Sequence, residues 1–196
     1  MKILLTGTTG YIGQRLLPVL IEQGHEVYCC VRDKNRFNSR YVSKNIHLVE
    51  VDFLQEETLQ NIPDDIDIAY YLIHSMSSEQ GDFSEMEKTS AINFKTRIEK
   101  TRTRQVIYLS GIVNEEELSQ HLSSRKNVED ILSQSTFAIT TLRAGIIIGS
   151  GSASFEIIRD LVEKLPVMVA PRWLKTRSQP IAIRNVIEFL SGVIDR

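Results

Sequence analysis

The first fourteen residues constrain the fold of this chain more than any other segment. An apolar run at 3–5 predicts a buried strand, and the residues after it form a loop with three glycines, Gly7, Gly10 and Gly13. An apolar helix is predicted to follow, over 16–23, with Gly24 closing it. Strand, glycine turn and helix in this order cradle the phosphates of a dinucleotide. The segment therefore indicates a class of ligand as well as a fold.

The rest of the chain alternates between strand and helix patterns. Apolar runs bounded by polar residues predict buried strands at 27–31, 46–51, 68–73, 106–109 and 137–142. Helices are predicted after Asp52 and over 82–104, 119–135 and 155–164, with a short strand at 180–183 and a last helix from about Asn185. The apolar face of 82–104 is expected to carry Phe83, Met86, Ile92 and Ile98. This order predicts one domain over 1–196, a doubly wound α/β fold with a mostly parallel sheet (Rossmann fold).

Composition excludes several classes of partner. The chain has 196 residues, 42% of them hydrophobic, and a formal charge of −2, which gives no sign of nucleic-acid binding. No apolar stretch approaches the length of a membrane span. The two cysteines, Cys29 and Cys30, are neighbours in a predicted strand, so they point to opposite faces and cannot easily form a disulfide. Buried thiols of this kind predict a protein of the reducing cytoplasm.

The glycine loop is the predicted phosphate site. Gly7 permits the tight turn after the strand, Gly10 lets the backbone approach the pyrophosphate, and Gly13 lets the helix pack closely. The backbone N–H groups near Tyr11 and Ile12 are expected to face the phosphates, with Thr8 and Thr9 inside the same loop. The alternative is a glycine-rich turn without a ligand, which the flanking strand and helix argue against.

Arg32 decides between the two nicotinamide cofactors. An NAD site usually ends the second strand with an acid that binds the ribose 2′-OH, whereas an arginine suits the 2′-phosphate of NADP. Arg32 occupies that position, and Lys34 and Arg36 add positive charge nearby. Asp33 keeps NAD open as an alternative, and a solvated basic loop is the second alternative. We therefore expect NADP rather than NAD.

Two further strand ends are predicted to line the cofactor crevice. Asp52 and Phe53 follow the third strand, beside the expected position of the adenine, although Asp52 is also a good helix N-cap. Ile73 and His74 end the fourth strand. His74 is placed to contact the cofactor or to move protons, and a histidine held by a local hydrogen bond is the alternative.

Several segments resemble the short-chain dehydrogenase/reductase superfamily, in particular its extended and atypical branches. The loop Gly7–Gly13 and the segment Tyr108-Leu-Ser110-Gly111 are similar to the fingerprint and the fifth strand of that superfamily. Essentially the whole chain takes part in the resemblance, which extends to NAD-dependent epimerase/dehydratase-like or NmrA-like members and is closest to a bacterial atypical group of NAD(P)-binding proteins. Further matching segments lie at 69–76, 121–125, 143–155 and 165–168. Such members often continue into a C-terminal domain, so the resemblance implies that 1–196 is the N-terminal part of a longer protein.

The resemblance also implies a catalytic site from which the expected pair is missing. Active members use a tyrosine and a lysine four residues later, and the matching positions here are His121 and Arg125. Spacing i, i+4 places both on one helix face, where His121 would transfer a proton and Arg125 would bind ribose hydroxyls. Ser110 would bind a substrate carbonyl. Ordinary structural roles for His121 and Arg125 are an equal alternative.

The segment after the sixth strand completes the implied cofactor site. In the superfamily it passes the nicotinamide, so Arg143, Ala144 and Gly145 are expected there, with pairing of Arg143 to a local acid as the alternative. The resulting expectation is an NADP-dependent oxidoreductase or isomerase acting on a small carbonyl or hydroxyl substrate. A non-catalytic NAD(P)-binding sensor, regulatory or assembly module is the alternative, and a scaffold without nucleotide is a third, weaker reading. The residues leave the oligomeric state open.

Overall fold

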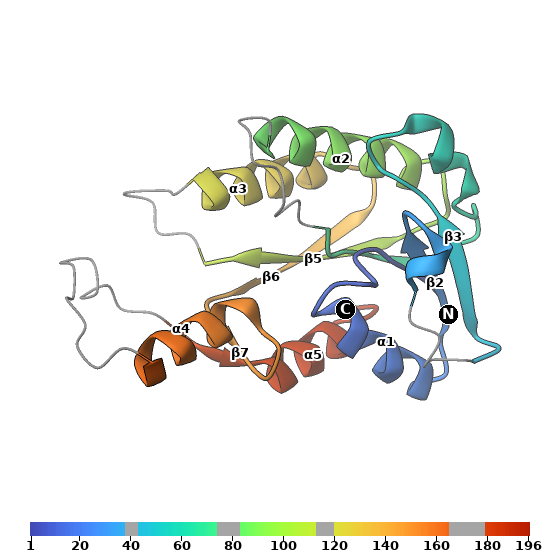
Figure 1. Ribbon diagram of the computed structural model, residues 1–196. Coiled ribbons are helices and arrows are strands. Elements are labelled where there is room, and N and C mark those ends of the chain that lie inside the picture. The colour runs from blue at the N-terminus through green and yellow to red at the C-terminus, as the bar shows by residue number, and fades with distance from the viewer. Residues whose placement is uncertain (38–42, 74–82, 113–119, 165–178) are drawn as a thin grey trace.

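A six-stranded parallel sheet forms the centre of the molecule in the computed structural model, which describes residues 1–37, 43–73, 83–112, 120–164 and 179–196 (Figure 1). The strand order is β3-β2-β1-β4-β5-β6. The crossover from β3 back to β4, which lies beside β1, reverses the direction in which strands are added, as in a doubly wound fold. The strands are β1 (Lys2–Leu5), β2 (Glu26–Val31), β3 (Ile46–Glu50), β4 (Ile68–Tyr71), β5 (Gln105–Gly111) and β6 (Ala138–Ala144).

Helices cover both faces of this sheet. Figure 1 shows α2 (Phe83–Ile98) and α3 (Gln120–Ser133) above it, and α1 (Gly13–Glu22) and α5 (Ile183–Gly192) below it. A two-stranded parallel sheet of β7 (Ile147–Ile148) and β8 (Ile181–Ala182) lies on the side of α5 and α4 (Ala153–Lys164). The doubly wound α/β fold predicted from the sequence is confirmed. No helix in the described ranges is long and apolar enough to cross a membrane.

The alternation of side chains along the strands divides the core between the two faces. Leu4 and Cys30 pack under α2 and α3, whereas their neighbours Leu5 and Cys29 pack under α1 and α5. Because successive strand residues point to opposite faces, a parallel sheet covered on both sides needs uninterrupted apolar runs, which is the pattern in the sequence. Leu5 pairs in register with Cys29 of β2 and Tyr70 of β4.

The buried face of α2 differs from the one predicted. Ile92, expected in the core, is 42% exposed. The inner stripe instead carries, in helical order, Glu87, Ser90, Ala91, Phe94 and Ile98. Two polar residues lie in this stripe and an isoleucine lies outside it, so apolar periodicity alone selected a face rotated from the true one. The tertiary position of α2 against β4 and β5 overrides that pattern.

Several boundaries also differ from the prediction. The helix after Asp52 is a short 3-10 helix, η2 (Glu56–Asn61), whose N-cap is Gln55 rather than Asp52. The α2 helix ends at Ile98, before the predicted Arg104, and the Thr101 hydroxyl donates to the Ile98 carbonyl at 2.7 Å, which satisfies one terminal acceptor. Strand β7 (Ile147–Ile148) was not predicted.

The adjacent cysteines should be inert in the folded protein. Both are free thiols buried on opposite faces of the sheet, and burial raises the pKa of Cys29 to about 12 and raises that of Cys30 as well. Since the thiolate is the nucleophile, we expect neither to react with an aromatic disulfide reagent at pH 8. Both should react once guanidinium unfolds the chain. One rapidly reacting thiol in the native protein would contradict this placement.

Candidate functional site

A cavity of about 490 Å³ lies where β1, β2, β3 and β4 end. In a doubly wound sheet, ligands bind outside the carboxyl ends of the strands, next to the point where the strand order reverses. Each of the four strands contributes the residues directly after its end, and α2 and α3 contribute the remainder. The lining comprises Gly7, Thr9, Gly10, Tyr11, Ile12, Gly13, Cys30, Val31, Arg32, Val51, Asp52, Phe53, Leu54, Leu72, Ile73, Met86, Ser90 and Arg125.

The glycine loop at this cavity leaves no room for side chains at two positions. Gly7 has φ +63°, and a Cβ there would lie 2.3 Å from the Leu72 carbonyl oxygen. A Cβ on Gly13 would lie 2.3 Å from the Gly7 carbonyl oxygen. The first turn of α1 thus rests directly on the loop, and the loop rests on the end of β4. Thr8 is buried beneath them, where its hydroxyl donates to the Leu5 carbonyl at 2.7 Å.

The N-terminus of α1 opens into the cavity without a cap. No side chain caps its first turn, and that turn contains no acidic residue. Among the described residues, the N–H groups of Tyr11 and Ile12 have no hydrogen-bond acceptor. Unsatisfied N–H groups at a helix N-terminus form a natural anion site. The loop and helix therefore fit a phosphate group, which the sequence pattern also predicts.

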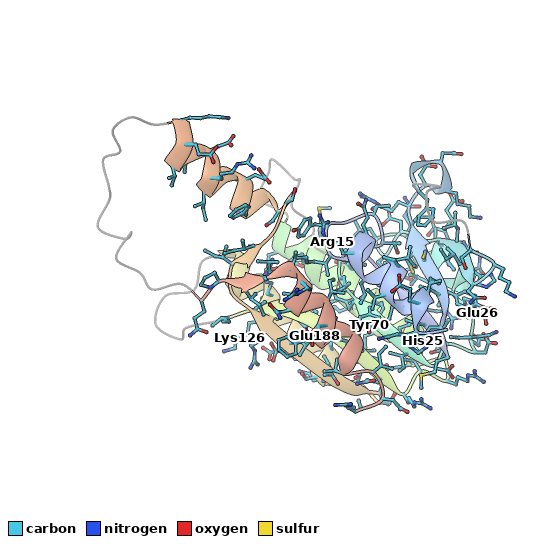
Figure 2. The ribbon with its side chains drawn as sticks, turned by 90° about the horizontal axis from the view of Figure 1, so that it is seen from below. Arg15, His25, Glu26, Tyr70, Lys126 and Glu188 are labelled. Carbon is cyan, nitrogen blue, oxygen red and sulfur yellow. The ribbon has the colours of Figure 1, made fainter. Side chains whose placement is uncertain are left out.

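Arg15 fixes the outer side of this loop. Its guanidinium lies 3.8 Å from the centre of the Tyr11 ring, and it donates to the carbonyls of Tyr11 at 3.1 Å and Ser150 at 2.7 Å. Figure 2 shows Arg15 on α1, at the end of the helix towards α4, and Glu188 on the neighbouring α5. The loop after β7 is thereby tied to the glycine loop.

Arg32 follows β2 and lines the cavity with an exposed side chain. It makes no ion pair within the described ranges. The carboxylate of Asp33, in contrast, accepts a hydrogen bond from the Asn35 N–H at 2.9 Å and caps the short helix η1 (Lys34–Arg36). The Lys34 Nζ lies 3.8 Å from Oε2 of Glu50, with which it forms an ion pair. Arg32 is thus the cation at this strand end that faces the cavity.

Asp52 and Phe53 form the far wall. The Asp52 carboxylate accepts from the Leu54 N–H at 3.0 Å, which closes a local turn. Phe53 is buried, with its ring centroid 5.6 Å from that of Phe94, and its carbonyl accepts from the Asn93 side chain at 2.8 Å. Both residues line the cavity at the position predicted for an adenine.

Arg125 reaches the same cavity from α3. The hydroxyl of Tyr108, on β5, donates to the Arg125 carbonyl at 3.2 Å. Burial raises the pKa of Tyr108 to about 12, which the nearby Ser110 and Arg125 offset only in part. Tyr108 is therefore unsuited to exchange a proton near neutral pH.

Ser110, His121 and His74 have less defined places. Ser110 lies in β5, and its buried hydroxyl oxygen lacks a well-formed hydrogen bond to the described residues. It is not among the lining residues of the cavity. His121 is in the first turn of α3, where the structure describes only its backbone. His74 lies outside the described residues. The predicted roles of these three residues stay predictions.

Arg143 and Ala144, predicted to follow the sixth strand, are the last two residues of β6, and this strand end is not at the cavity. Arg143 forms an ion pair with Glu129 of α3, which is the alternative to a cofactor contact that the sequence left open. The Ala144 carbonyl accepts from the Ile112 N–H at 3.1 Å. Gly145 packs against the Gln179 backbone. None of the three lines the cavity.

Sequence reasoning missed the contribution of α2. Met86 and Ser90 line the cavity, and neither stands in a motif. Their signal was the helical spacing i, i+4, but it was obscured because the apolar face of this helix was predicted at a different rotation. Leu72, Cys30 and Val51 line the cavity through their positions at strand ends.

Several solved structures with the same fold are epimerases of sugar nucleotides. The UDP-glucose 4-epimerase of Thermotoga maritima, solved with UDP-glucose, has a TM-score of 0.76 at 16% identity, covering 100% of this chain and 74% of that one. The UDP-glucose 4-epimerase of Thermus thermophilus, solved with NAD, has a TM-score of 0.75 at 16% identity, and the match covers 100% of this chain and 75% of that one. The enzyme WbmH of Bordetella bronchiseptica, solved with NAD+, has a TM-score of 0.76 at 18% identity, and the match covers 99% of this chain and 72% of that one.

These identities show a shared fold, whereas the sequence itself shows the family. No curated protein matches the chain significantly. Residues 3–110, more than half of the chain, match the profile of the NAD dependent epimerase/dehydratase family. The matched region runs from β1 through β5 and includes the glycine loop, Arg32 and the strand ends around the cavity. The chain belongs to the NAD dependent epimerase/dehydratase family, within the short-chain dehydrogenase/reductase superfamily.

Proposed function

We propose that this chain binds NADP in the cavity at the strand ends. The observation that carries the proposal is the uncapped N-terminus of α1, which shares one cavity with the glycine loop and Arg32. The N–H groups of Tyr11 and Ile12 would bind the pyrophosphate, and Asp52 and Phe53 would contact the adenine. Ile73 would line the middle of the site.

The preference for NADP over NAD rests on the difference between Arg32 and Asp33. Arg32 faces the cavity without an ion pair in the described part of the chain, while the Asp33 carboxylate is engaged with the Asn35 N–H. A guanidinium binds phosphate through two parallel hydrogen bonds, and a 2′-phosphate is the group that distinguishes NADP. WbmH and the epimerase of Thermus thermophilus were solved with NAD, so Arg32 would mark a difference from these two neighbours.

The reaction that fits the family is oxidation and reduction, or isomerisation, at a carbonyl or hydroxyl carbon of a small substrate. The nicotinamide, when bound, supplies and accepts the hydride. Arg125 would orient the nicotinamide half of the cofactor, because it reaches the cavity from α3. Ser110 would donate a hydrogen bond to the substrate oxygen, and His121 would transfer the proton.

A non-catalytic nucleotide-binding module is the second candidate, and one observation favours it. Tyr108 is buried, its hydroxyl donates to the Arg125 carbonyl, and its pKa is raised to about 12. Tyr108 therefore cannot replace the missing family tyrosine. In this candidate the cavity senses NADP, and residues 1–196 act as a single nucleotide-binding domain within a larger assembly.

Calorimetric titration with NADPH and NADH tests the proposal. We expect NADPH to bind at least about tenfold more tightly, a difference of about 1.4 kcal/mol. Arg32→Ala should remove that difference by weakening NADPH alone, because only the 2′-phosphate loses its partner. Arg104→Ala is the matched control, since it deletes an exposed arginine that pairs with Asp195, away from the cavity.

Either of two results would refute parts of the proposal. Equal affinity of the wild type for NADPH and NADH would refute the NADP preference and leave a dinucleotide site. No binding of either nucleotide would refute the cofactor assignment itself. Consumption of NADPH with a panel of carbonyl substrates, abolished in His121→Ala, would select the enzyme over the sensor.

A further inference from the structure

The buried stripes of α2 and α3 become polar where they approach the cavity. On α2 the stripe ends in Phe94 and Ile98 but begins with Glu87, a residue that is only 5% exposed. On α3 the stripe continues through Val128 and Leu132 but begins with Ser124, which is 2% exposed. Both polar residues lie in the second turn of their helices. The other buried polar residues of α2 are Ser90, which lines the cavity, and Asn93, whose side chain donates to the Phe53 carbonyl in the cavity wall. The buried polar residues that the structure describes in these helices therefore lie beside the site.

Two hydrogen bonds hold consecutive residues in the second turn of α3, Ser124 and Arg125. The Ser124 hydroxyl donates to the Glu87 carboxylate, which ties α3 to α2. The Tyr108 hydroxyl donates to the Arg125 carbonyl, which ties α3 to β5. Arg125 is the residue of α3 that lines the cavity. Its backbone is thus anchored from a helix on one side and from the sheet on the other.

A carboxylate in this position needs a reason other than packing. Burying a charge is costly unless hydrogen bonds and other partners compensate for the lost water, and well-packed apolar residues in its place are often equally stable. The N-terminal half of α2 favours a negative charge only modestly. Apolar side chains at positions 87 and 124 would also hold the two helices together. They would not fix the rotation of α3 about its axis or its position along that axis, as the directional hydrogen bonds Ser124–Glu87 and Tyr108–Arg125 do.

We propose that Glu87, Ser124 and Tyr108 are positioning residues that hold Arg125 against the nicotinamide half of the bound dinucleotide. This inference rests on the proposed function, because it assumes that a dinucleotide occupies the cavity. Arg125 and Arg32 both line that cavity, but they come from different elements, α3 and the end of β2. Loosening α3 should therefore weaken contacts to one half of the ligand and leave the half bound at Arg32 unchanged.

The test compares a whole dinucleotide with its adenine half in Glu87→Leu. Titration of the wild type and the variant uses NADPH and adenosine 2′,5′-bisphosphate, which carries the 2′-phosphate but no nicotinamide. We expect the affinity for NADPH to fall about tenfold, the effect of one misplaced charged contact, while the affinity for the bisphosphate stays within about twofold. The urea midpoint should change only modestly, because leucine removes a buried charge but leaves the Ser124 hydroxyl without this acceptor.

Four companion variants separate positioning from general stability. Glu87→Gln keeps an acceptor for Ser124 and should retain most of the affinity for NADPH. Tyr108→Phe removes only the hydroxyl and should repeat the selective loss. In an Arg125→Ala background, Glu87→Leu should have no further effect, because the carboxylate acts through that arginine. Thr103→Val removes a buried hydroxyl that donates to the Ile66 carbonyl, before β5, and should lower stability without changing either affinity.

The outcomes distinguish this inference from the proposed function. Equal losses for NADPH and the bisphosphate in both Glu87→Leu and Tyr108→Phe, or full additivity with Arg125→Ala, would overturn the positioning role while the site itself stands. A wild type that binds neither ligand would overturn the proposed function and this inference with it.

Discussion

Gly13→Ala is expected to lower the affinity for NADPH by at least about 100-fold, equivalent to about 2.7 kcal/mol. A Cβ at Gly13 would lie 2.3 Å from the Gly7 carbonyl oxygen and 2.9 Å from the Thr8 Cα, both of them backbone atoms. No rotamer change relieves such a contact, so α1 and the glycine loop must separate. Separation moves the N–H groups of Tyr11 and Ile12 away from the phosphate position. Titration calorimetry with NADPH measures the loss.

Gly192→Ala is the matched control for this variant. Gly192 ends α5, and a Cβ there would have no neighbour within 4 Å. Both substitutions place alanine at a helical position, where its intrinsic propensity is higher than that of glycine. Gly192→Ala should therefore bind NADPH as the wild type does. Tight binding by Gly13→Ala would show that the loop does not cradle the ligand.

Phe94→Ala is expected to destabilise the fold by about 3–5 kcal/mol, the usual effect of deleting a buried aromatic ring. Phe94 is fully buried on α2, with its ring centroid 4.8 Å from that of Tyr71 in an edge-on arrangement and 5.6 Å from that of Phe53. Those neighbours belong to β4 and to the cavity wall, so the space cannot close without moving both. Urea unfolding, followed by circular dichroism, measures the change in free energy.

Ile92→Ala, two residues earlier on the same helix, is the control. Ile92 is largely exposed, so its truncation should cost less than about 1 kcal/mol. The pair also tests the rotation of α2 itself. A larger loss for Ile92→Ala than for Phe94→Ala would place Ile92 in the core, as apolar periodicity predicts, and would contradict the face seen in the structure.

The strands and the glycine loop were predictable for a local reason. Strands β1, β2, β4 and β5 are covered on both faces, so their sequences are continuous apolar runs that no exposed segment would carry. Gly7 occupies a positive φ and Gly13 a close contact, and both conditions concern residues only a few positions apart. The class of ligand could be inferred because the phosphate-binding geometry is built from one short continuous segment.

The helices on the far side of the cavity were less predictable. Glu87 is buried and Ile92 exposed because α2 packs against α3 and, through Phe94, against Tyr71 of β4, and its own sequence does not encode these contacts. Met86 and Ser90 reach the cavity for the same reason, whereas Arg125 lines it at a position that the resemblance implied. Arg143 pairs with Glu129 instead, since β6 and α3 bring these two side chains together although fourteen positions separate them.

The sequence by itself therefore determined the order of elements, the parallel sheet, the family and the phosphate loop. Each of these depends on the hydrophobicity or backbone freedom of neighbouring residues, which a linear pattern records. Only the tertiary structure decided which face of α2 is buried, that Arg143 pairs with Glu129 and does not line the cavity, and that Glu87 lies beside it. Those properties depend on how elements distant in the chain pack together, and packing is settled by the shape and polarity of all the partners at once.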